Sequence, residues 1–442
     1  MAGIIVLLII VGCAVFQFLK GTIVRAFATI IVAISACLVA FGFFELVAAL
    51  LIKRGNSGSM LAVVPWAHSL GFLLLFVLVF AVLQTVVIQI TRKHTIDLGF
   101  MPERIGRVVL GIILGLIVSG VLMTFLTMAP LPSKYPYERF DPRNIKIDSP
   151  NKVLLNVDGF VTGLFGVVSN GSFSGQRSFT CLRPDLLDQF FLNRLESDVS
   201  LVSGSTPAIE IPRDKAVWPA SENLKTQIEE LNSEGKFSRT PGRPTEPIGA
   251  YQVMVVRVGI KKKAINREQK ISAGTFTLSQ LRLICKPRGY DGGPLEGKGI
   301  NVYPLGYFKT ANQIETNTKI KVEQGDFSGN SSTKYIDFIF AVPGGFVPAL
   351  VEFKLNSVVQ IPTNAILTDA ADAPATAAME QSSEVQRPDR PQEQEPSEET
   401  DQGQTEPQPA ENPTTEPNDN PQQNRTERLT ESLTGLQFDE GQ

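Results

Sequence analysis

The sequence predicts an α-helical membrane bundle of about four transmembrane helices, an extracytoplasmic α+β region with an antiparallel β-sandwich, and a disordered C-terminal tail. Three observations support this division of the 442 residues. Residues 1–130 are almost wholly apolar, residues 250–366 hold short runs of β-branched and aromatic residues, and residues 367–442 are rich in Glu, Pro and Gln. Residues 131–249 form a mixed helix and loop region between the first two.

Four apolar stretches in the first region are candidate membrane spans. A helix needs ~20 apolar residues to cross a hydrocarbon core of ~30 Å. The stretches are Ile4–Leu19, Ala26–Ile52, Leu61–Ile90 and Ile105–Met128. The first is the shortest, and its segment Ile10-Val11-Gly12-Cys13 resembles a lipoprotein cleavage site. No basic residue precedes it and the apolar run continues past Cys13, so we expect a retained helix in a lipid bilayer.

The charges between the spans predict the orientation of the bundle. The first and third links are the more basic, and they contain Lys20, Arg25, Arg92, Lys93, Arg104 and Arg107. The second link contains only Lys53 and Arg54. Because basic links remain in the cytoplasm, everything after Pro130 is expected to be extracytoplasmic, with the bundle in a bacterial inner membrane.

A few polar or small residues in the spans are functional candidates. Glu45 is an ionisable residue within a span, and two interpretations remain: a structural anchor at the outer interface, or part of a polar transport path. His68 is expected at the outer interface. Gly111 and Gly115 lie four residues apart, a spacing that lets helix backbones approach closely, either within the bundle or in a homo-oligomer.

The pattern of the membrane region resembles the colicin V production (CvpA) family over residues 4–130. The resemblance rests on Lys20, Gly21 and Arg25 after the first span, and on Glu103, Arg104, Gly111 and Gly115 at the start of the fourth. It implies an inner-membrane protein linked to toxin production or export and to envelope maintenance.

Short periodic segments follow the bundle. Val153–Ser169 and Leu186–Leu195 have the spacing of short helices. Seven runs have the composition of strands in a sandwich or barrel: Tyr251–Ile260, Thr275–Lys286, Ile300–Lys309, Lys319–Glu323, Lys334–Val342, Ala349–Leu355 and Val358–Ile361. The stretch Tyr335–Phe353 predicts two strands around a Pro-Gly-Gly turn and weakly resembles immunoglobulin-like domains of bacterial surface proteins.

The region outside the membrane lacks the residues that most catalytic sites need. Its Gly171–Gly175 segment has Phe173 where a nucleophile elbow has serine, and the two histidines, His68 and His94, both belong to the membrane region. We therefore expect no enzyme, no catalytic residue, and no cofactor, metal or nucleic acid. A Ser-Lys pair using Ser172 or Ser174 is a distant alternative.

Two cysteines lie outside the spans. Cys181 and Cys285 are either buried free thiols or a disulfide, since an extracytoplasmic location permits pairing.

The tail has a different composition from the rest of the chain. Residues 367–442 contain 18 acidic and 4 basic side chains, which leaves the remaining chain basic by about 11 charges. Near its end, Leu429, Leu433 and Leu436 share one helical face in Arg425–Phe438. This pattern suits docking on an unknown protein partner. The sequence as a whole predicts a non-enzymatic membrane protein that displays a β-rich binding domain, and the alternative is a transport or channel component using Glu45.

Overall fold

The computed structural model describes residues 1–20, 22–55, 61–91, 100–170, 178–196, 199–268, 273–327 and 331–380. Several expectations fall outside these residues. They concern Gly21 of the membrane motif, His94, Ser172 and Ser174, and the leucines of segment 425–438. The fold below is that of the unit Met1–Ser383.

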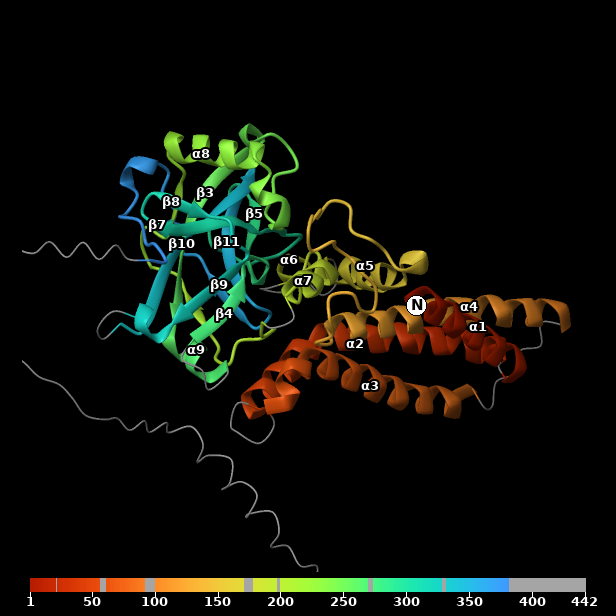
Figure 1. The fold of residues 1–442 in the computed structure, drawn as a ribbon. Helices are drawn as coiled ribbons and strands as arrows, with labels where there is room; N and C mark the ends of the chain where they lie inside the picture. The colour runs from red at the N-terminus through yellow and green to blue at the C-terminus, as the bar shows by residue number, and fades with distance from the viewer. Residues whose placement is uncertain are drawn as a thin grey trace, which may run out of the picture. The chain divides into compact units, whose positions relative to one another are not determined.

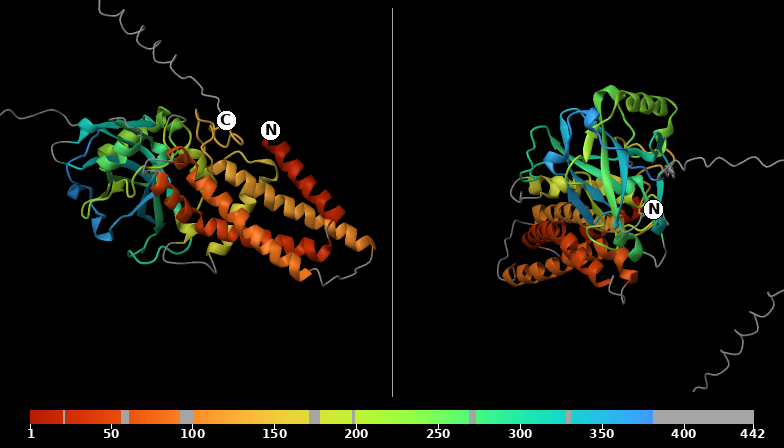
Figure 2. Two further views of the ribbon diagram at one scale, coloured as in Figure 1. Left: turned by 90° about the horizontal axis from the view of Figure 1, so that it is seen from below. Right: turned by 90° about the vertical axis from the view of Figure 1, so that its left-hand side faces the viewer.

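Four long apolar helices form the first part of this unit, as the sequence predicts (Figure 1). They are α1 (Ala2–Lys20), α2 (Ile23–Gly55), α3 (Ala67–Thr91) and α4 (Phe100–Met128), with a 3-10 turn at Leu61–Trp66 before α3. Helix α2 packs mainly on α3, and α1 mainly on α4. Both views of Figure 2 show the four helices side by side. Their outer faces expose large apolar side chains such as Leu8 and Leu74, so the chain is a multi-pass membrane protein whose bundle is in contact with lipid.

Most of the described basic residues of the bundle lie at one end, whereas Lys53 and Arg54 lie in the last turn of α2 at the other. Arg104 at the start of α4 lies over the ring of Phe18 near the end of α1, 5.7 Å from its centroid. Gly106 of α4 lies against Ile23, two residues before Arg25 at the start of α2. Glu103 and Arg107 form an ion pair on the same turn. The end of the bundle with the N-terminus, Glu45 and the chain after Pro130 is the opposite one.

Short helices connect the bundle to the sheets. They are α5 (Val157–Asn170), α6 (Phe179–Leu182) and α7 (Leu186–Asn193), and α5 and α7 lie where the sequence predicts them. Helix α5 packs on α4 and contacts α2. A later helix, α8 (Glu222–Ser233), begins at the N-cap Ser221, whose side chain accepts a hydrogen bond from the amide of Leu224.

Antiparallel strands form the rest of the unit. A six-stranded sheet has the order β1 (Ile209–Glu210), β3 (Tyr251–Lys261), β10 (Thr333–Pro343), β7 (Pro304–Thr310) and β8 (Gln313–Glu315), with β2 (Val217–Pro219) also paired to β3. A four-stranded sheet has the order β12 (Ser357–Gln360), β11 (Phe346–Phe353), β5 (Leu281–Pro287) and β6 (Ile300–Val302). Strands β4 (Ala273–Thr277) and β9 (Lys319–Glu323) pair with each other, and α9 (Lys262–Glu268) precedes β4.

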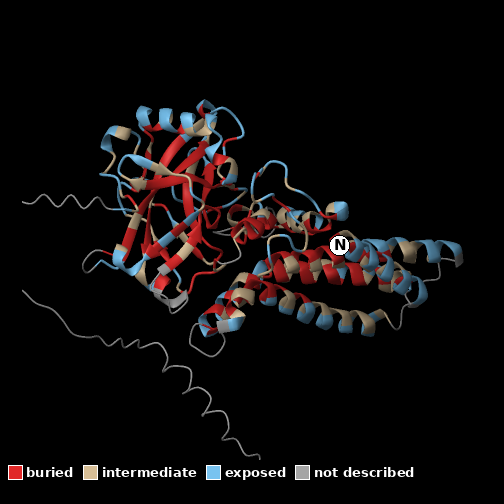
Figure 3. Cartoon of the chain, in the orientation of Figure 1, coloured by how far each residue is buried: buried red, intermediate tan, exposed pale blue. Residues whose placement is uncertain are grey.

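The sandwich core lies between the two larger sheets. Alternate residues of β3, including Val256 and Val258, pack with Leu283 of β5 and Val351 of β11. The other face of β3 presents Val253 and Val255 to α8 and its neighbours. In Figure 3 the strands of the sheets are largely red, the colour of buried residues. Because β1 and β2 precede residue 250 and pair with β3, the two regions expected on either side of residue 250 share one sheet.

Two predicted strands are each divided between sheets. The expected Thr275–Lys286 is interrupted by a 3-10 turn at Leu278–Gln280, where Thr277 and Gln280 form a capping box. The expected Ile300–Lys309 breaks at Tyr303. The strands on either side of the Pro-Gly-Gly turn are also in different sheets, because β10 pairs with β3 and β7 while β11 pairs with β5 and β12.

The segment after residue 366 continues along the sandwich. The Leu367 amide donates to Val217, and the Asp337 amide donates to Ala377. The amides of Met379 and Glu380 donate to the carbonyls of Phe308 and Lys309 on β7. Residues 367–380, which the composition assigns to the tail, are therefore bonded to both β10 and β7.

Candidate functional site

A buried arginine links the membrane bundle to the β-sandwich. Arg183, between α6 and α7, donates from Nε to Glu45 Oε1 of α2 over 2.7 Å. Its Nη2 donates to the carbonyl of Leu355 over 3.0 Å, and its Nη1 donates to Gln189 over 3.2 Å. The same Nη1 pairs with Glu352 of β11. The Arg183 side chain is 4% exposed, so these partners take the place of water.

A second arginine completes the charge balance. Arg282 of β5 pairs with Glu352 and donates to Asn301 and to the carbonyl of Leu182. We call Glu45, Arg183, Arg282 and Glu352 the ion network. It contains two cations and two anions, which suits a buried site because an unpaired charge there is strongly unfavourable.

The electrostatic environment keeps Arg183 protonated. Burial lowers its pKa, but the carboxylates of Glu352 and Glu45 outweigh burial, and the net pKa is raised above its usual value. Burial and the neighbouring Arg183 charge lower the pKa of Arg282, against the opposing effect of Glu352. The ion network is therefore a fixed pairing of charges.

Glu45 lies in the second half of α2, after a long uncharged stretch. Residues 26–44 of α2 carry no charge, a length close to the ~20 residues that span a bilayer. Counting from Arg25, Glu45 is the next charged residue of this helix. Its side chain is 40% exposed, whereas Arg183 beside it is almost fully covered. The geometry favours the anchor interpretation of Glu45, with an ion-pair partner that the sequence did not indicate.

Arg194 forms another contact at this end of the bundle. Its Nη1 donates to the carbonyls of Leu126 and Ala129 at the C-terminal end of α4, over 3.2 and 3.1 Å. A helix C-terminus has unpaired carbonyls and partial negative charge, so a guanidinium is a favourable cap. The guanidinium also stacks over Phe191 of α7, 4.4 Å from the ring centroid.

His68, expected at the outer interface, is buried within the protein, where it is only 4% exposed. Its ring lies between Phe44 of α2 and Phe190 of α7, with centroid distances of 6.1 and 6.0 Å. It contributes to the packing that joins the bundle to α7.

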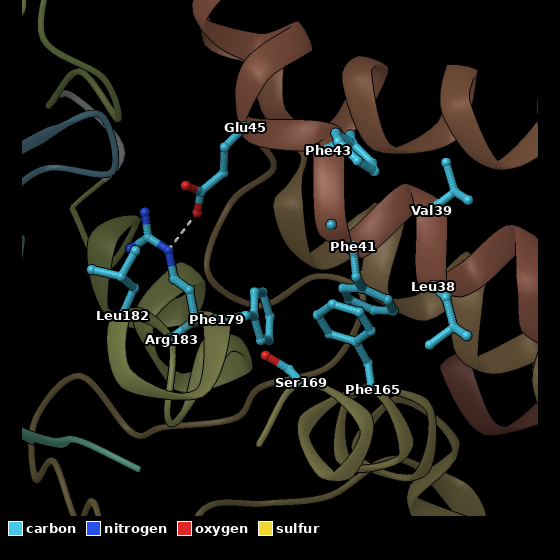
Figure 4. Close-up of a pocket in the computed structure, with 11 residues that line it drawn as sticks. Leu38, Val39, Phe41, Phe43, Glu45, Phe165, Ser169, Phe179, Leu182 and Arg183 are labelled. Carbon is cyan, nitrogen blue, oxygen red and sulfur yellow. Dashed lines mark hydrogen bonds and ion pairs between the residues drawn. The ribbon is translucent and has the colours of Figure 1, made fainter. Parts of the chain in front are cut away.

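A cavity of about 330 Å³ lies beside the ion network. We call it the α2–α5 cavity. Figure 4 shows the rings of Phe41, Phe165 and Phe179 grouped together in its wall, with the Glu45–Arg183 pair at one end. Phe165 lies 5.1 Å from Phe41 and 4.6 Å from Phe179 between centroids. The cavity is thus apolar along most of its length and charged at one end.

The glycines of the fourth span lie inside the bundle. A Cβ on Gly111 would meet the Ala14 Cα at 2.6 Å, and one on Gly115 would meet the Ile10 Cα at 2.6 Å. Both belong to α1 of the same chain, so this close approach is intramolecular. The homo-oligomer contact considered for these glycines would require α1 to move away.

The other residues of the family-like motif lie at the basic end, remote in the chain from the ion network. Arg25 begins α2, Glu103 pairs with Arg107, and Arg104 lies over Phe18. Lys20 is the last residue of α1.

Both cysteines outside the spans are free thiols. Cys181 and Cys285 are each 0% exposed. Burial raises the pKa of both thiols, and for Cys181 the nearby Lys286 and Arg282 partly oppose that effect. Of the two alternatives, buried free thiols or a disulfide, the structure has the free thiols.

Comparisons with known proteins found no match: no family model, no curated protein and no solved structure matches this chain.

Proposed function

We propose that this chain is a non-enzymatic inner-membrane protein of the CvpA type that holds a β-rich binding domain outside the cytoplasm. The role implied is in envelope maintenance or in toxin production and export. The C-terminal segment would act as a recruitment arm for a protein partner. The observation that supports this most is the ion network, because it joins a membrane helix to the sandwich at the end opposite the basic residues.

A tightly held domain suits binding better than gating. Arg183 has partners on α2, on α7 and at the end of β11, and its own guanidinium is almost fully buried between them. Because the contacts of Arg183 would all have to break together, they hold the bundle and the sandwich in one relative arrangement. A ligand or partner on the sandwich would therefore be kept at a fixed place near the membrane surface.

Cysteine labelling of the full-length chain tests the orientation. Glu222 at the start of α8 is 87% exposed, and Met101 at the basic end is 67% exposed. In intact spheroplasts, a membrane-impermeant maleimide should label Glu222→Cys, and it should label Met101→Cys only after lysis. Of the four native thiols, Cys37, Cys181 and Cys285 are buried and the half-buried Cys13 lies within the apolar helix α1, so a membrane-impermeant reagent gives little background. The reverse labelling pattern would refute extracytoplasmic display.

The alternative is a transport or channel component with a polar path at Glu45. One observation favours it: the Glu45 side chain is 40% exposed beside the α2–α5 cavity. Proton or ion flux into liposomes that contain the protein should then fall sharply in Glu45→Gln. Flux equal to that of protein-free liposomes in both wild type and variant would exclude this alternative.

A further inference from the structure

A second cavity adjoins the α2–α5 cavity. It has a volume of about 390 Å³, and Phe179 and Arg183 contribute to the walls of both. We call it the basic cavity, because Arg139, Lys152 and Lys298 also line it. Its acidic residues are Asp188, which pairs with Arg139, and Asp185.

The basic cavity favours an anion. Arg139 is neutralised by Asp188, and Arg183 by the carboxylates of the ion network. The remaining charges are the two ammonium groups of Lys152 and Lys298 and the one carboxylate of Asp185. The hydroxyl groups of Thr162 and Thr180 in the wall already donate within the protein, to the carbonyls of α5 and to Ser169 Oγ. The lysine ammonium groups are therefore the donors for a ligand, and ammonium groups are usual partners of a phosphate.

The helix between the two cavities has an apolar outer surface. On α5, Phe160 is 49% exposed and Val167 is 76% exposed. The two residues are seven positions apart, so they lie on one face of the helix. Phe43, on the rim of the α2–α5 cavity, is 52% exposed. Large apolar side chains exposed on a membrane protein favour contact with lipid. Because Phe43 lines the α2–α5 cavity and Val167 lines the basic cavity, each cavity borders such an exposed apolar side chain.

We propose that the two cavities together bind one membrane phospholipid with an anionic head group. An acyl chain fills the apolar α2–α5 cavity, between α2 and the rings of Phe165 and Phe179. The phosphate lies in the basic cavity, near Lys152 and Lys298. The combined volume lies in the range of about 300–1,000 Å³ that is typical of small-molecule sites. The lipid is bound at the joint between the bundle and the sandwich, beside Arg183.

Native mass spectrometry of the full-length protein tests the proposal. The detergent-purified chain is mixed with equal amounts of phosphatidylglycerol and phosphatidylethanolamine that carry the same acyl chains. We expect one retained lipid per chain, with phosphatidylglycerol preferred about tenfold. Retention of neither lipid, or equal retention of both by wild type, would overturn the proposal.

Two matched glycine variants test the acyl-chain cavity. Gly42 lines the α2–α5 cavity, and a Cβ there would meet nothing within 4 Å. Gly12 on α1 also has open space, but it lies outside the cavity. Gly42→Leu should reduce retained lipid about tenfold, whereas Gly12→Leu should not. If Gly42→Leu does not fold, Val39→Trp on the cavity wall replaces it. Unchanged retention in the folded filling variant would refute the acyl-chain site.

The head-group site has a separate test. The double variant Lys152→Gln, Lys298→Gln should still retain lipid but lose the preference for phosphatidylglycerol. Lys321→Gln is the control, since this exposed lysine lies on β9. Glycerol phosphate supplies a phosphate anion, as a monoester, without an acyl chain, and it should not raise the melting temperature when phosphatidylglycerol does. Stabilisation by glycerol phosphate alone would identify a soluble-anion site and overturn the lipid proposal, as would a preference that survives the double variant.

Discussion

Arg183 Nε donates to Glu45 Oε1 over 2.7 Å, so an arginine of the α+β region pairs with a carboxylate of a membrane helix. The same guanidinium pairs with Glu352 on β11. Helix α2, the link that holds Arg183 and strand β11 are far apart in the chain, and they meet at the buried guanidinium of Arg183. This pairing makes the bundle and the sandwich parts of one packed unit.

Removing the central arginine should destabilise the full chain. Arg183→Ala leaves the carboxylate of Glu352, which is 0% exposed, with Arg282 as its one remaining ion-pair partner among the described residues. Breaking a buried pair from one side costs about 3–5 kcal/mol of unfolding free energy. Chemical unfolding in detergent measures this loss. The exposed pair of Lys225 and Glu222 is the control, since Lys225→Ala should cost less than about 1 kcal/mol. Equal effects of the two variants would contradict the central role of Arg183.

Adding a methyl group at the close contact between α1 and α4 should also destabilise the bundle. Gly111→Ala and Gly115→Ala place a Cβ 2.6 Å from backbone atoms of Ala14 and Ile10. Overpacking of this kind costs about 1–3 kcal/mol. Gly12→Ala on α1 meets no atom within 4 Å and should be neutral or stabilising. Thermal unfolding of the three variants makes the comparison, and a neutral Gly115→Ala would show that α1 does not pack there.

The ionisation of Asp188 should make stability depend on pH. Burial raises the pKa of Asp188 from 3.8 to about 6, against the opposing charge of Arg139. The folded state then binds this proton more tightly than the unfolded state, so its contribution to stability is greatest below pH 3.8 and decreases as the pH rises to about 6. Asp188→Asn should flatten the stability curve in that window. Glu222→Gln, at an exposed site, should leave the slope unchanged. A slope in Asp188→Asn equal to that of wild type would reject this assignment.

The two thiols outside the spans should be unreactive until the chain unfolds. Cys181 and Cys285 are fully buried, and burial raises the pKa of each thiol, which reduces the reactive thiolate. A small maleimide should label neither in the folded protein and both in denaturant. The same result is expected without prior reduction, because both thiols are free. Labelling in denaturant that required a reductant would indicate a disulfide.

The sequence predicts the parts of this fold that depend on local composition. The four spans follow from apolar length, and α5 and α7 follow from helical spacing. The division of Thr275–Lys286 was missed because all its residues suit a strand, and only the capping contacts between Thr277 and Gln280 show the break. The capping pair, Thr followed by Gln three residues later, was the available signal.

The ion network shows the limit of sequence analysis for the site. Glu45 was identified because a carboxylate in an apolar helix is conspicuous. Arg183 was not, since it lies between a short helix and Pro184 with nothing local to mark it. Its partners Glu45 and Glu352 are 138 and 169 positions away in the chain. A contact of that separation depends on the folded arrangement of the whole unit.

The hydrogen bonds of residues 377–380 have a consequence for where this protein can be shortened. The change in composition after residue 366 suggests a natural place for a stop codon. A chain ended there would lose the segment that bonds to Asp337 on β10 and to Phe308 and Lys309 on β7. Unpaired strand edges are templates for pairing between chains. A protein shortened at residue 366 would therefore be prone to aggregate. Its loss of function would then be wrongly attributed to the missing acidic residues rather than to the missing hydrogen bonds of residues 377–380.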